Sequence, residues 1–216
     1  MTRTVVCFGD SLTHGTCAMA GPDDVRRFGP RERWTGVLAE RLSPEWHVIE
    51  EGHPGRTTLH SDPIEGAHKN GLQGLRITLE THRPIDLVVI MLGMNDFKPR
   101  FSVEARDIAL SVGKLAVEVQ ASPAGPLQGA PDVLVVAPPV AQECGWLGPH
   151  FKGAEAKSQA LASELEAEMA RWSVPFLDAG QVVGVDPIDG IHLALEAQAP
   201  LAPAIADMIE AHFPAA

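Results

Sequence analysis

The residues with the clearest chemical potential lie in four short blocks spread along the chain. Ser11 follows a short apolar run in the sequence FGDSL, and Asn95 follows another in LGMND. A glycine-rich block, EGHPGRTT, contains Gly55, and DGIHL near the C-terminus contains Asp189 and His192. A serine, a histidine, an acid and several hydrogen-bond donors are the groups that acyl transfer through a covalent intermediate requires.

The spacing of these residues suggests a role for each. A serine hydroxyl is a weak nucleophile until a base removes its proton, and a histidine can do so near neutral pH. Asp189 and His192 are three residues apart, so a helical turn places both on one face. The acid then reaches one ring nitrogen of His192 while the other faces Ser11. The N–H groups of Ser11 and Gly55 and the amide of Asn95 are the predicted oxyanion donors.

Short apolar segments, rich in valine and isoleucine, are the predicted strands that position these blocks. Four of these segments are well defined: Val5–Phe8, Leu87–Leu92, Val133–Ala137 and Pro175–Leu177. A fifth, Trp46–Ile49, has a weaker pattern. Segments that are apolar on both faces suit a parallel sheet covered on both sides. Ligands of such sheets bind outside the carboxyl ends of the strands, which is where the four blocks lie.

Helical spacing of apolar residues fills the intervals between these strands. It is found over Trp34–Leu42, Ile108–Val119 and Ala154–Trp172, and again at the C-terminus. Strands that alternate with helices predict an α/β fold with an open, doubly wound sheet, and we expect residues 1–216 to form one domain. Pro200 and Pro203 would break a helix interior, so the last helix is expected to begin near Ala199.

Composition narrows the class of partner. The 216 residues carry a formal charge of −11, which argues against nucleic acid or an anionic membrane as a partner. No apolar run approaches the ~20 residues that span a bilayer, and no secretory signal is visible. The three cysteines cannot all pair and have no metal-type spacing, which favours the reducing cytoplasm.

The four blocks, in this order, resemble those of the GDSL or SGNH hydrolase family, whose blocks carry Ser, Gly, Asn and His. The stretches RWTGVLAERL, VIEEG and LVVIMLGMND are similar to the bacterial arylesterase and acyltransferase branch, which also includes carbohydrate acetylesterases. The resemblance covers the whole chain. It implies a flavodoxin-like, three-layer α/β/α sandwich with about five parallel strands, and a Ser-His-Asp carboxylic ester hydrolase without cofactor or metal. Members of this branch often self-associate, so a homo-oligomer is expected.

Other interpretations of the same residues remain open. Ser11 could cap a helix, Asp189 could be a turn acid, and Asp186 competes with it for the role beside His192. Asn95 with Asp96 could be a simple turn pair, and Asp10 and Asp96 are expected to be structural. The loop residues His60, Asp62 and His68 match no zinc spacing, and the dinucleotide motif G-x-G-x-x-G is absent.

The expected substrate is a small ester, chiefly an acetyl ester of an aryl or alkyl alcohol, that is hydrolysed or transferred through an acyl-enzyme. The alternative is an acetylated sugar, and a rival of another class is a flavodoxin-like module that binds FMN or phosphate. Residues expected to line the substrate pocket are His14, Cys17, Met94, Phe97, Trp146 and His150, although packing explains Phe97 and Trp146 equally well. The irregular loops 60–76 and 138–153 are expected to lie over the site.

Overall fold

A central sheet of five parallel strands organises the computed structural model, which describes residues 2–214. The strand order is β2-β1-β3-β4-β5. The bounds are β1 Arg3–Gly9, β2 Trp46–Gly52, β3 Leu87–Met91, β4 Asp132–Ala137 and β5 Phe176–Asp178. All five predicted strands are therefore present.

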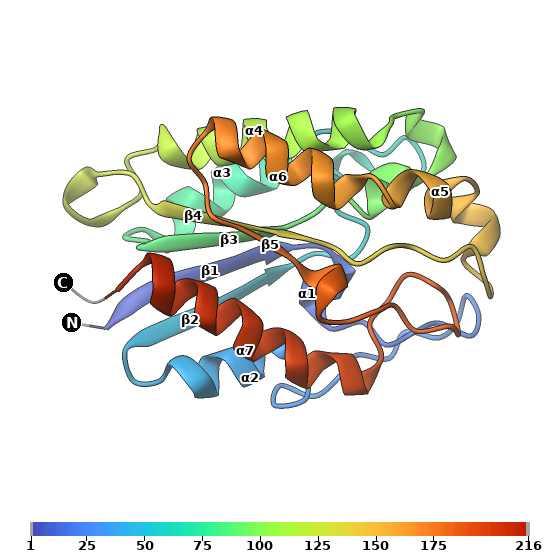
Figure 1. The fold of residues 1–216 in the computed structure, drawn as a ribbon, viewed down its shortest axis with the longest axis horizontal. Coiled ribbons are helices and arrows are strands. Elements are labelled where there is room, and N and C mark those ends of the chain that lie inside the picture. Colours follow the sequence, from blue (N-terminus) through green and yellow to red (C-terminus); the bar gives the residue numbers. More distant parts are fainter. Residues whose placement is uncertain (1, 215–216) are drawn as a thin grey trace.

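Helices cover both faces of the sheet. The α-helices are α1 Ser11–His14, α2 Trp34–Leu42, α3 Gly71–His82, α4 Ala105–Gln120, α5 Ala154–Ser158, α6 Leu161–Arg171 and α7 Leu195–His212. Short 3₁₀ turns are η1 Ala67–Lys69, η2 Asn95–Phe97, η3 Pro99–Phe101, η4 Pro126–Gln128, η5 Gly148–Phe151 and η6 Ala179–Gln181. Helices α2 and α7 lie on one face and α3, α4 and α6 on the other (Figure 1). The predicted three-layer α/β/α sandwich is confirmed.

The inner strands are apolar on both faces because both faces are covered. Val5, Val6, Cys7 and Phe8 of β1 are all fully buried, as are nearly all residues of β3. They belong to one continuous hydrophobic cluster that includes residues from both helical layers. Burial also raises the pKa of the Cys7 thiol far above its usual range, so this cysteine behaves as a small apolar residue.

Three helical segments differ from the sequence-based expectation. Helix α3 was not predicted, and its first residues fall within the 60–76 segment that was expected to be an irregular loop. The segment predicted as one helix over Ala154–Trp172 is divided into α5 and α6. Helix α7 begins at Leu195, before the expected start near Ala199, and contains both Pro200 and Pro203. Both prolines lie on its exposed face, where water can hydrogen-bond the carbonyl oxygens that lose their N–H partners.

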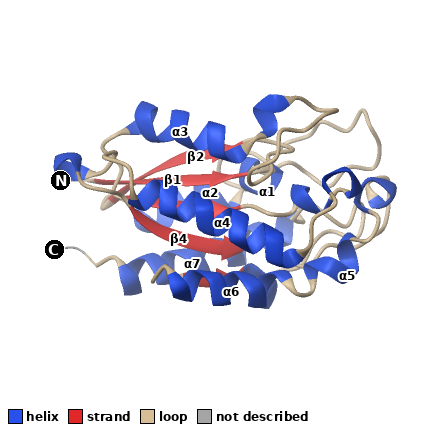
Figure 2. Ribbon diagram, turned by 90° about the horizontal axis from the view of Figure 1, so that it is seen from above, coloured by secondary structure: helices blue, strands red, loops and turns tan. Residues whose placement is uncertain are grey.

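The long loops gather at the carboxyl ends of the strands, opposite the end that holds both chain termini (Figures 1 and 2). Helix α1 follows β1 directly and packs against the end of β2. A Cβ on Gly52 would come within 2.2 Å of the His14 nitrogen, so only glycine permits this approach. None of the helices within residues 2–214 has the length and apolar character needed to cross a membrane.

Candidate active site

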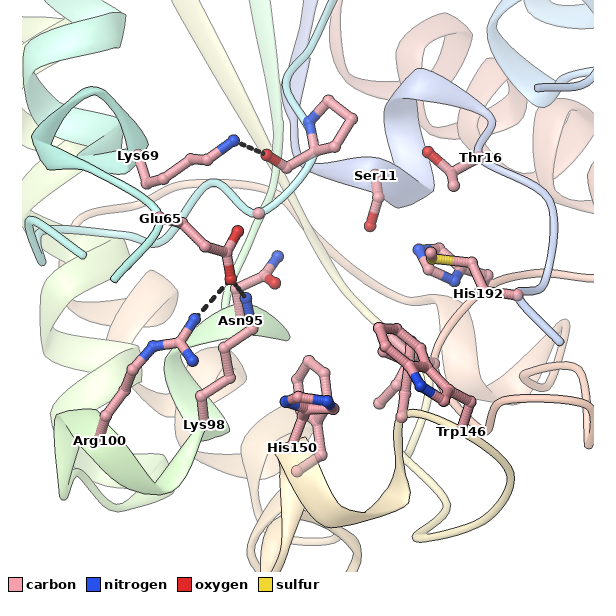
Figure 3. A pocket seen from close by; sticks show the side chains of 16 residues that line it. Ser11, Thr16, Glu65, Lys69, Asn95, Lys98, Arg100, Trp146, His150 and His192 are labelled. Carbon is pink, nitrogen blue, oxygen red and sulfur yellow. Dashed lines mark hydrogen bonds and ion pairs between the residues drawn. The ribbon is translucent and has the colours of Figure 1, made fainter. Parts of the chain in front are cut away.

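A single helical turn holds Ser11 just beyond the carboxyl end of β1. Its neighbour Asp10, not Ser11 itself, is the N-cap of α1, because the Asp10 carboxylate accepts a hydrogen bond of 2.9 Å from the Leu12 N–H. The His14 N–H donates to the Asp10 carbonyl at 2.9 Å and closes the turn. Ser11 is therefore the first residue of the helix, and its hydroxyl points into a cavity (Figure 3).

The second predicted group is an acid–histidine pair. Asp189 is fully buried, and its Oδ2 accepts from His192 Nδ1 at 2.6 Å and from the Met19 N–H at 2.7 Å. Its Oδ1 accepts from the N–H groups of Ile191 at 3.0 Å and His192 at 2.9 Å. The carboxylate can only accept these bonds, so His192 Nδ1 carries the proton and Nε2 is left as an acceptor.

The hydrogen bonds also decide the charge of Asp189. Burial disfavours its carboxylate, but the hydrogen bonds and the charge of His192 outweigh burial, so that the pKa of Asp189 lies below its usual value. Asp186, the competing acid, instead accepts a bond of 2.8 Å from the Ile188 N–H. The structure thus places Asp189, and not Asp186, against the histidine ring.

Ser11 and His192 line one cavity of about 300 Å³ at the carboxyl ends of the strands (Figure 3). Gly55 and Asn95 line the same cavity, so the structure brings together all four blocks identified in the sequence. The remaining lining residues are Thr16, Met19, Pro54, Glu65, Lys69, Lys98, Arg100, Trp146, Leu147, His150, Phe151 and Ile191. An ester in this cavity can therefore meet a hydroxyl, an imidazole and several N–H donors.

The three predicted oxyanion donors differ in their present hydrogen bonding. Within residues 2–214, neither the Ser11 nor the Gly55 N–H donates to a protein acceptor, so both are free for a ligand. Gly55 has φ +77°, a conformation that glycine adopts at little cost. Asn95, at the start of η2, donates from Nδ2 to Asp10 Oδ2 at 3.1 Å and to the Arg56 carbonyl at 3.2 Å. An oxyanion would take the second of these hydrogens from Arg56.

Two buried carboxylates stabilise the loops around the site. Burial raises the pKa of Asp10 to about 6 and that of Asp96 to about 7. Asp10 joins α1 to Asn95, as described above. Asp96 accepts from the Thr58 N–H at 3.0 Å and from the Thr58 hydroxyl, which fixes the loop after Gly55 to the loop after β3. Both carboxylates thus accept hydrogen bonds that connect neighbouring segments around the site, as expected of structural residues.

Two of the residues predicted to line the pocket do so. Trp146 and His150, in and beside η5, both face the cavity, and their ring centroids are 5.1 Å apart (Figure 3). They belong to the 138–153 loop, whose irregular sequence suggested a position over the site. Trp146 and Asn95 line the same cavity (Figure 3).

The other four predicted pocket residues do not line the cavity. Met94 and Phe97 are 1% and 3% exposed and pack in the core, because the chain turns at η2 and directs only Asn95 outward. His14, the last residue of α1, shares a hydrogen bond of 2.9 Å with the Thr16 hydroxyl, and Cys17 lies in the loop that follows; neither residue lines the cavity. Their nearness to Ser11 in sequence does not place them near its hydroxyl.

The wall opposite His192 is charged, which the sequence did not predict. Glu65 Oε1 accepts from Lys98 Nζ at 2.6 Å and from Arg100 Nη2 at 2.5 Å. Lys69 Nζ donates to the Pro54 carbonyl at 2.8 Å (Figure 3). Glu65 and Lys69 come from the 60–76 segment, Lys98 lies between η2 and η3, and Arg100 lies in η3. No local motif connects these segments.

Comparison with known proteins gives consistent findings. The sequence model of the GDSL-like Lipase/Acylhydrolase family matches residues 7–200. The structure of the M. smegmatis aryl esterase in an inhibitor-bound form is 40% identical, with a TM-score of 0.92, over 97% of this chain and 99% of that one. A carbohydrate acetylesterase from Sinorhizobium meliloti is 41% identical, with a TM-score of 0.92, over 98% and 100%. No match was found among curated proteins.

Proposed function

Because the chain belongs to the GDSL-like lipase/acylhydrolase family and is a carboxylic ester hydrolase, we propose that Ser11, His192 and Asp189 are its nucleophile, base and orienting acid. The observation that carries the assignment is the 2.6 Å bond between Asp189 and His192 Nδ1, in a cavity shared with the Ser11 hydroxyl. This bond fixes the tautomer whose Nε2 can accept a proton.

In the proposed mechanism Ser11 Oγ attacks the ester carbonyl carbon while His192 Nε2 takes the hydroxyl proton. The carbonyl oxygen becomes an oxyanion that receives hydrogen bonds from the N–H groups of Ser11 and Gly55, and from Asn95 once its bond to Arg56 is exchanged. His192 returns the proton to the leaving alcohol as the tetrahedral intermediate collapses. A water molecule, or an acceptor alcohol, then releases the acyl group by the same steps in reverse.

We propose that the substrates are short-chain esters, chiefly acetates of small aryl or alkyl alcohols. Two observations support this class. The cavity of about 300 Å³ lies at the small end of the range for ligand sites, and its lining includes the apolar side chains of Leu147, Phe151 and Ile191 as well as Trp146. The similarity to an aryl esterase points in the same direction.

A second candidate, removal of O-acetyl groups from sugars, is favoured by the charged wall. Glu65, Lys69 and Arg100 offer donors and acceptors for sugar hydroxyls, and the Trp146 face suits a pyranose ring. The similarity to a carbohydrate acetylesterase supports the same candidate.

One panel of substrates separates the two candidates. Initial rates would be measured with p-nitrophenyl esters of increasing acyl length and with acetylated xylose and glucose, with Ser11→Ala as the blank. A higher kcat/KM for aryl acetate than for any acetylated sugar, with a steep fall beyond short acyl chains, supports the first candidate. A higher kcat/KM for an acetylated sugar than for aryl acetate supports the second candidate, removal of O-acetyl groups from sugars. Hydrolysis by Ser11→Ala at the wild-type rate would contradict both.

We also propose that the protein acts as one domain in the cytoplasm and assembles as a homo-oligomer. Three free cysteines fit a reducing compartment. The apolar side chains of Val25, Ile64 and Ile188 are 84%, 75% and 50% exposed, and Ile64 and Ile188 adjoin Glu65 and Asp189 in sequence. Light scattering on the purified protein would measure its mass in solution, and a monomer at micromolar concentration would contradict the assembly.

A further inference from the structure

Lys69 contacts the peptide group whose N–H is the proposed Gly55 oxyanion donor. A peptide unit consists of the carbonyl of one residue and the N–H of the next, so the Pro54 carbonyl and the Gly55 N–H belong to one rigid plane. The Lys69 ammonium donates to that carbonyl at 2.8 Å. The Gly55 N–H lies in the same plane and points in the opposite direction from the carbonyl. It has no protein acceptor within residues 2–214.

The lysine is aligned along this peptide by several contacts. A Cβ on Gly55 would lie 2.5 Å from Glu65 Oε2 and 3.3 Å from Lys69 Cε, so the lysine stem and the Glu65 carboxylate both pack against the glycine. The Lys69 carbonyl accepts from the Thr57 N–H at 2.9 Å and from its hydroxyl at 3.2 Å. Lys69 is therefore fixed at both its main chain and its ammonium to the segment that carries Gly55.

Charge distribution distinguishes Lys69 from the other cations of the same wall. Lys98 is paired with Glu65, and Arg100 with both Glu65 and Asp62. Lys69 has no carboxylate within ion-pair distance among the described residues. Among residues 2–214, the hydrogen-bond partners of its ammonium are the Pro54 carbonyl and, at 3.4 Å, Nε2 of His53. Glu65 and Asp62 act on the Lys69 charge from beyond ion-pair distance, so the Pro54 carbonyl, and not an anion, is the closest hydrogen-bond partner of the ammonium.

A charged donor on a carbonyl oxygen polarises the peptide and makes its N–H a stronger donor, because hydrogen bonds in a chain reinforce one another at low dielectric. The reinforcement grows as negative charge develops beyond the N–H, which happens in the transition state and not in the bound ester.

We propose that Lys69 is a positioning residue that orients and polarises the Pro54–Gly55 peptide for the oxyanion, an inference that rests on the proposed role of Gly55. Lys69 does not touch the reacting atoms. It raises kcat through the peptide, and it leaves binding of the uncharged ester almost unchanged.

The test compares Lys69→Met and Lys69→Arg with wild type. Methionine keeps most of the stem but removes the charge and the donors, whereas arginine retains both. The matched control is Lys157→Met, because Lys157 also donates to a main-chain carbonyl, that of Val103 at 3.1 Å, but outside the cavity. Hydrolysis of p-nitrophenyl acetate gives kcat and KM. Inhibition by phenylboronic acid, which forms a tetrahedral anion on a serine oxygen, reports the oxyanion site without turnover.

Loss of one complete oxyanion donor lowers kcat about 10²–10³-fold, and weakening one should cost part of that. We expect Lys69→Met to lower kcat about 5- to 20-fold and to change KM less than about twofold. The inhibition constant of phenylboronic acid should rise by about the same factor as kcat falls. Lys69→Arg should recover most of kcat, and Lys157→Met should match wild type.

A Lys69→Met enzyme with wild-type kcat, or one whose loss lies wholly in KM, would overturn the inference. So would loss of activity in Lys69→Arg equal to that in Lys69→Met, since arginine keeps the charged donor. Ser11→Ala keeps this result separate from the proposed function. If Ser11→Ala is inactive and Lys69→Met is normal, only the role of Lys69 fails. If Ser11→Ala is active, the proposed mechanism itself fails.

Discussion

Replacement of Asp189 by asparagine tests the proposed triad through its hydrogen bonds. The two carboxylate oxygens of Asp189 accept four N–H groups, two on each oxygen. An asparagine retains one oxygen and replaces the other by an NH₂ group, which only donates. Whichever way the amide is turned, two buried N–H groups then face a donor. Asp189→Asn is therefore disruptive although it changes the shape of the side chain very little.

The size of the effect follows from these contacts. A buried donor left without a partner costs about 1–3 kcal/mol, so two cost about 2–6 kcal/mol in the free energy of unfolding. Rotation of the amide toward His192 removes part of this cost if Nδ1 becomes the acceptor, but the proton then resides on Nε2. A histidine in that tautomer cannot take the Ser11 proton, and kcat should fall about 10⁴-fold.

Asp186→Asn is the matched control. It is the same chemical change three residues earlier. Among residues 2–214, the side chain there accepts one N–H, that of Ile188, which an asparagine oxygen can also accept. Steady-state hydrolysis of p-nitrophenyl acetate and thermal unfolding would be measured on both variants. We expect near-normal values for Asp186→Asn. Retention of more than about a tenth of kcat by Asp189→Asn, or an equal loss in Asp186→Asn, would refute the assignment of Asp189.

Three further predictions concern the loops around the site. Asn95→Ala should lower kcat about 10²–10³-fold and KM little, as measured by ester hydrolysis, and an unchanged kcat would remove Asn95 from the oxyanion site. The folded-state pKa of Asp96, about 7, lies above its usual 3.8, so the folded protein binds the extra proton and stability should fall as pH rises from about 4 through about 7. Asp96→Asn should flatten this fall in denaturant titrations, and parallel pH profiles would contradict it. Gly190 has φ +73°, and a Cβ there would lie 2.0 Å from the Gln142 carbonyl oxygen, so Gly190→Ala should lower stability by at least about 2 kcal/mol. A melting temperature equal to that of wild type would show that the loop carrying Asp189 adapts freely.

Much of the architecture was accessible from sequence because it depends on local patterns. The strand β1 was predicted from Val5–Phe8 because both faces of a covered parallel strand must be apolar. By contrast, α3 was missed because Gly71 and Gly74 weaken the helical pattern, although Asn70 caps the helix by accepting from the Gln73 N–H. The early start of α7 was missed because proline is tolerated on an exposed helix face.

In the candidate site, too, local sequence patterns predicted some residues and missed others. Three of the four blocks were recognisable because each combines a strand end with a chemically distinctive residue, and the fourth because an acid lies three residues before a histidine. The charged wall was not, because the contact between Glu65 and Lys98 joins residues 33 positions apart in loops without a repeating pattern. Likewise, the Met19 N–H that holds Asp189 is a main-chain donor, and no side-chain type marks it. Phe97 was misplaced because its neighbour Asn95 faces the cavity while the turn directs Phe97 into the core.

The most direct test of the proposed mechanism is to identify the residue that a fluorophosphonate probe labels. The probe reacts with a serine oxygen that a neighbouring base has activated, and it needs no assumption about the natural ester. Peptide mapping of the labelled protein should place the adduct on Ser11, and Ser11→Ala should show neither labelling nor hydrolysis of p-nitrophenyl acetate. An adduct on another residue, or hydrolysis by Ser11→Ala close to the wild-type rate, would contradict the account.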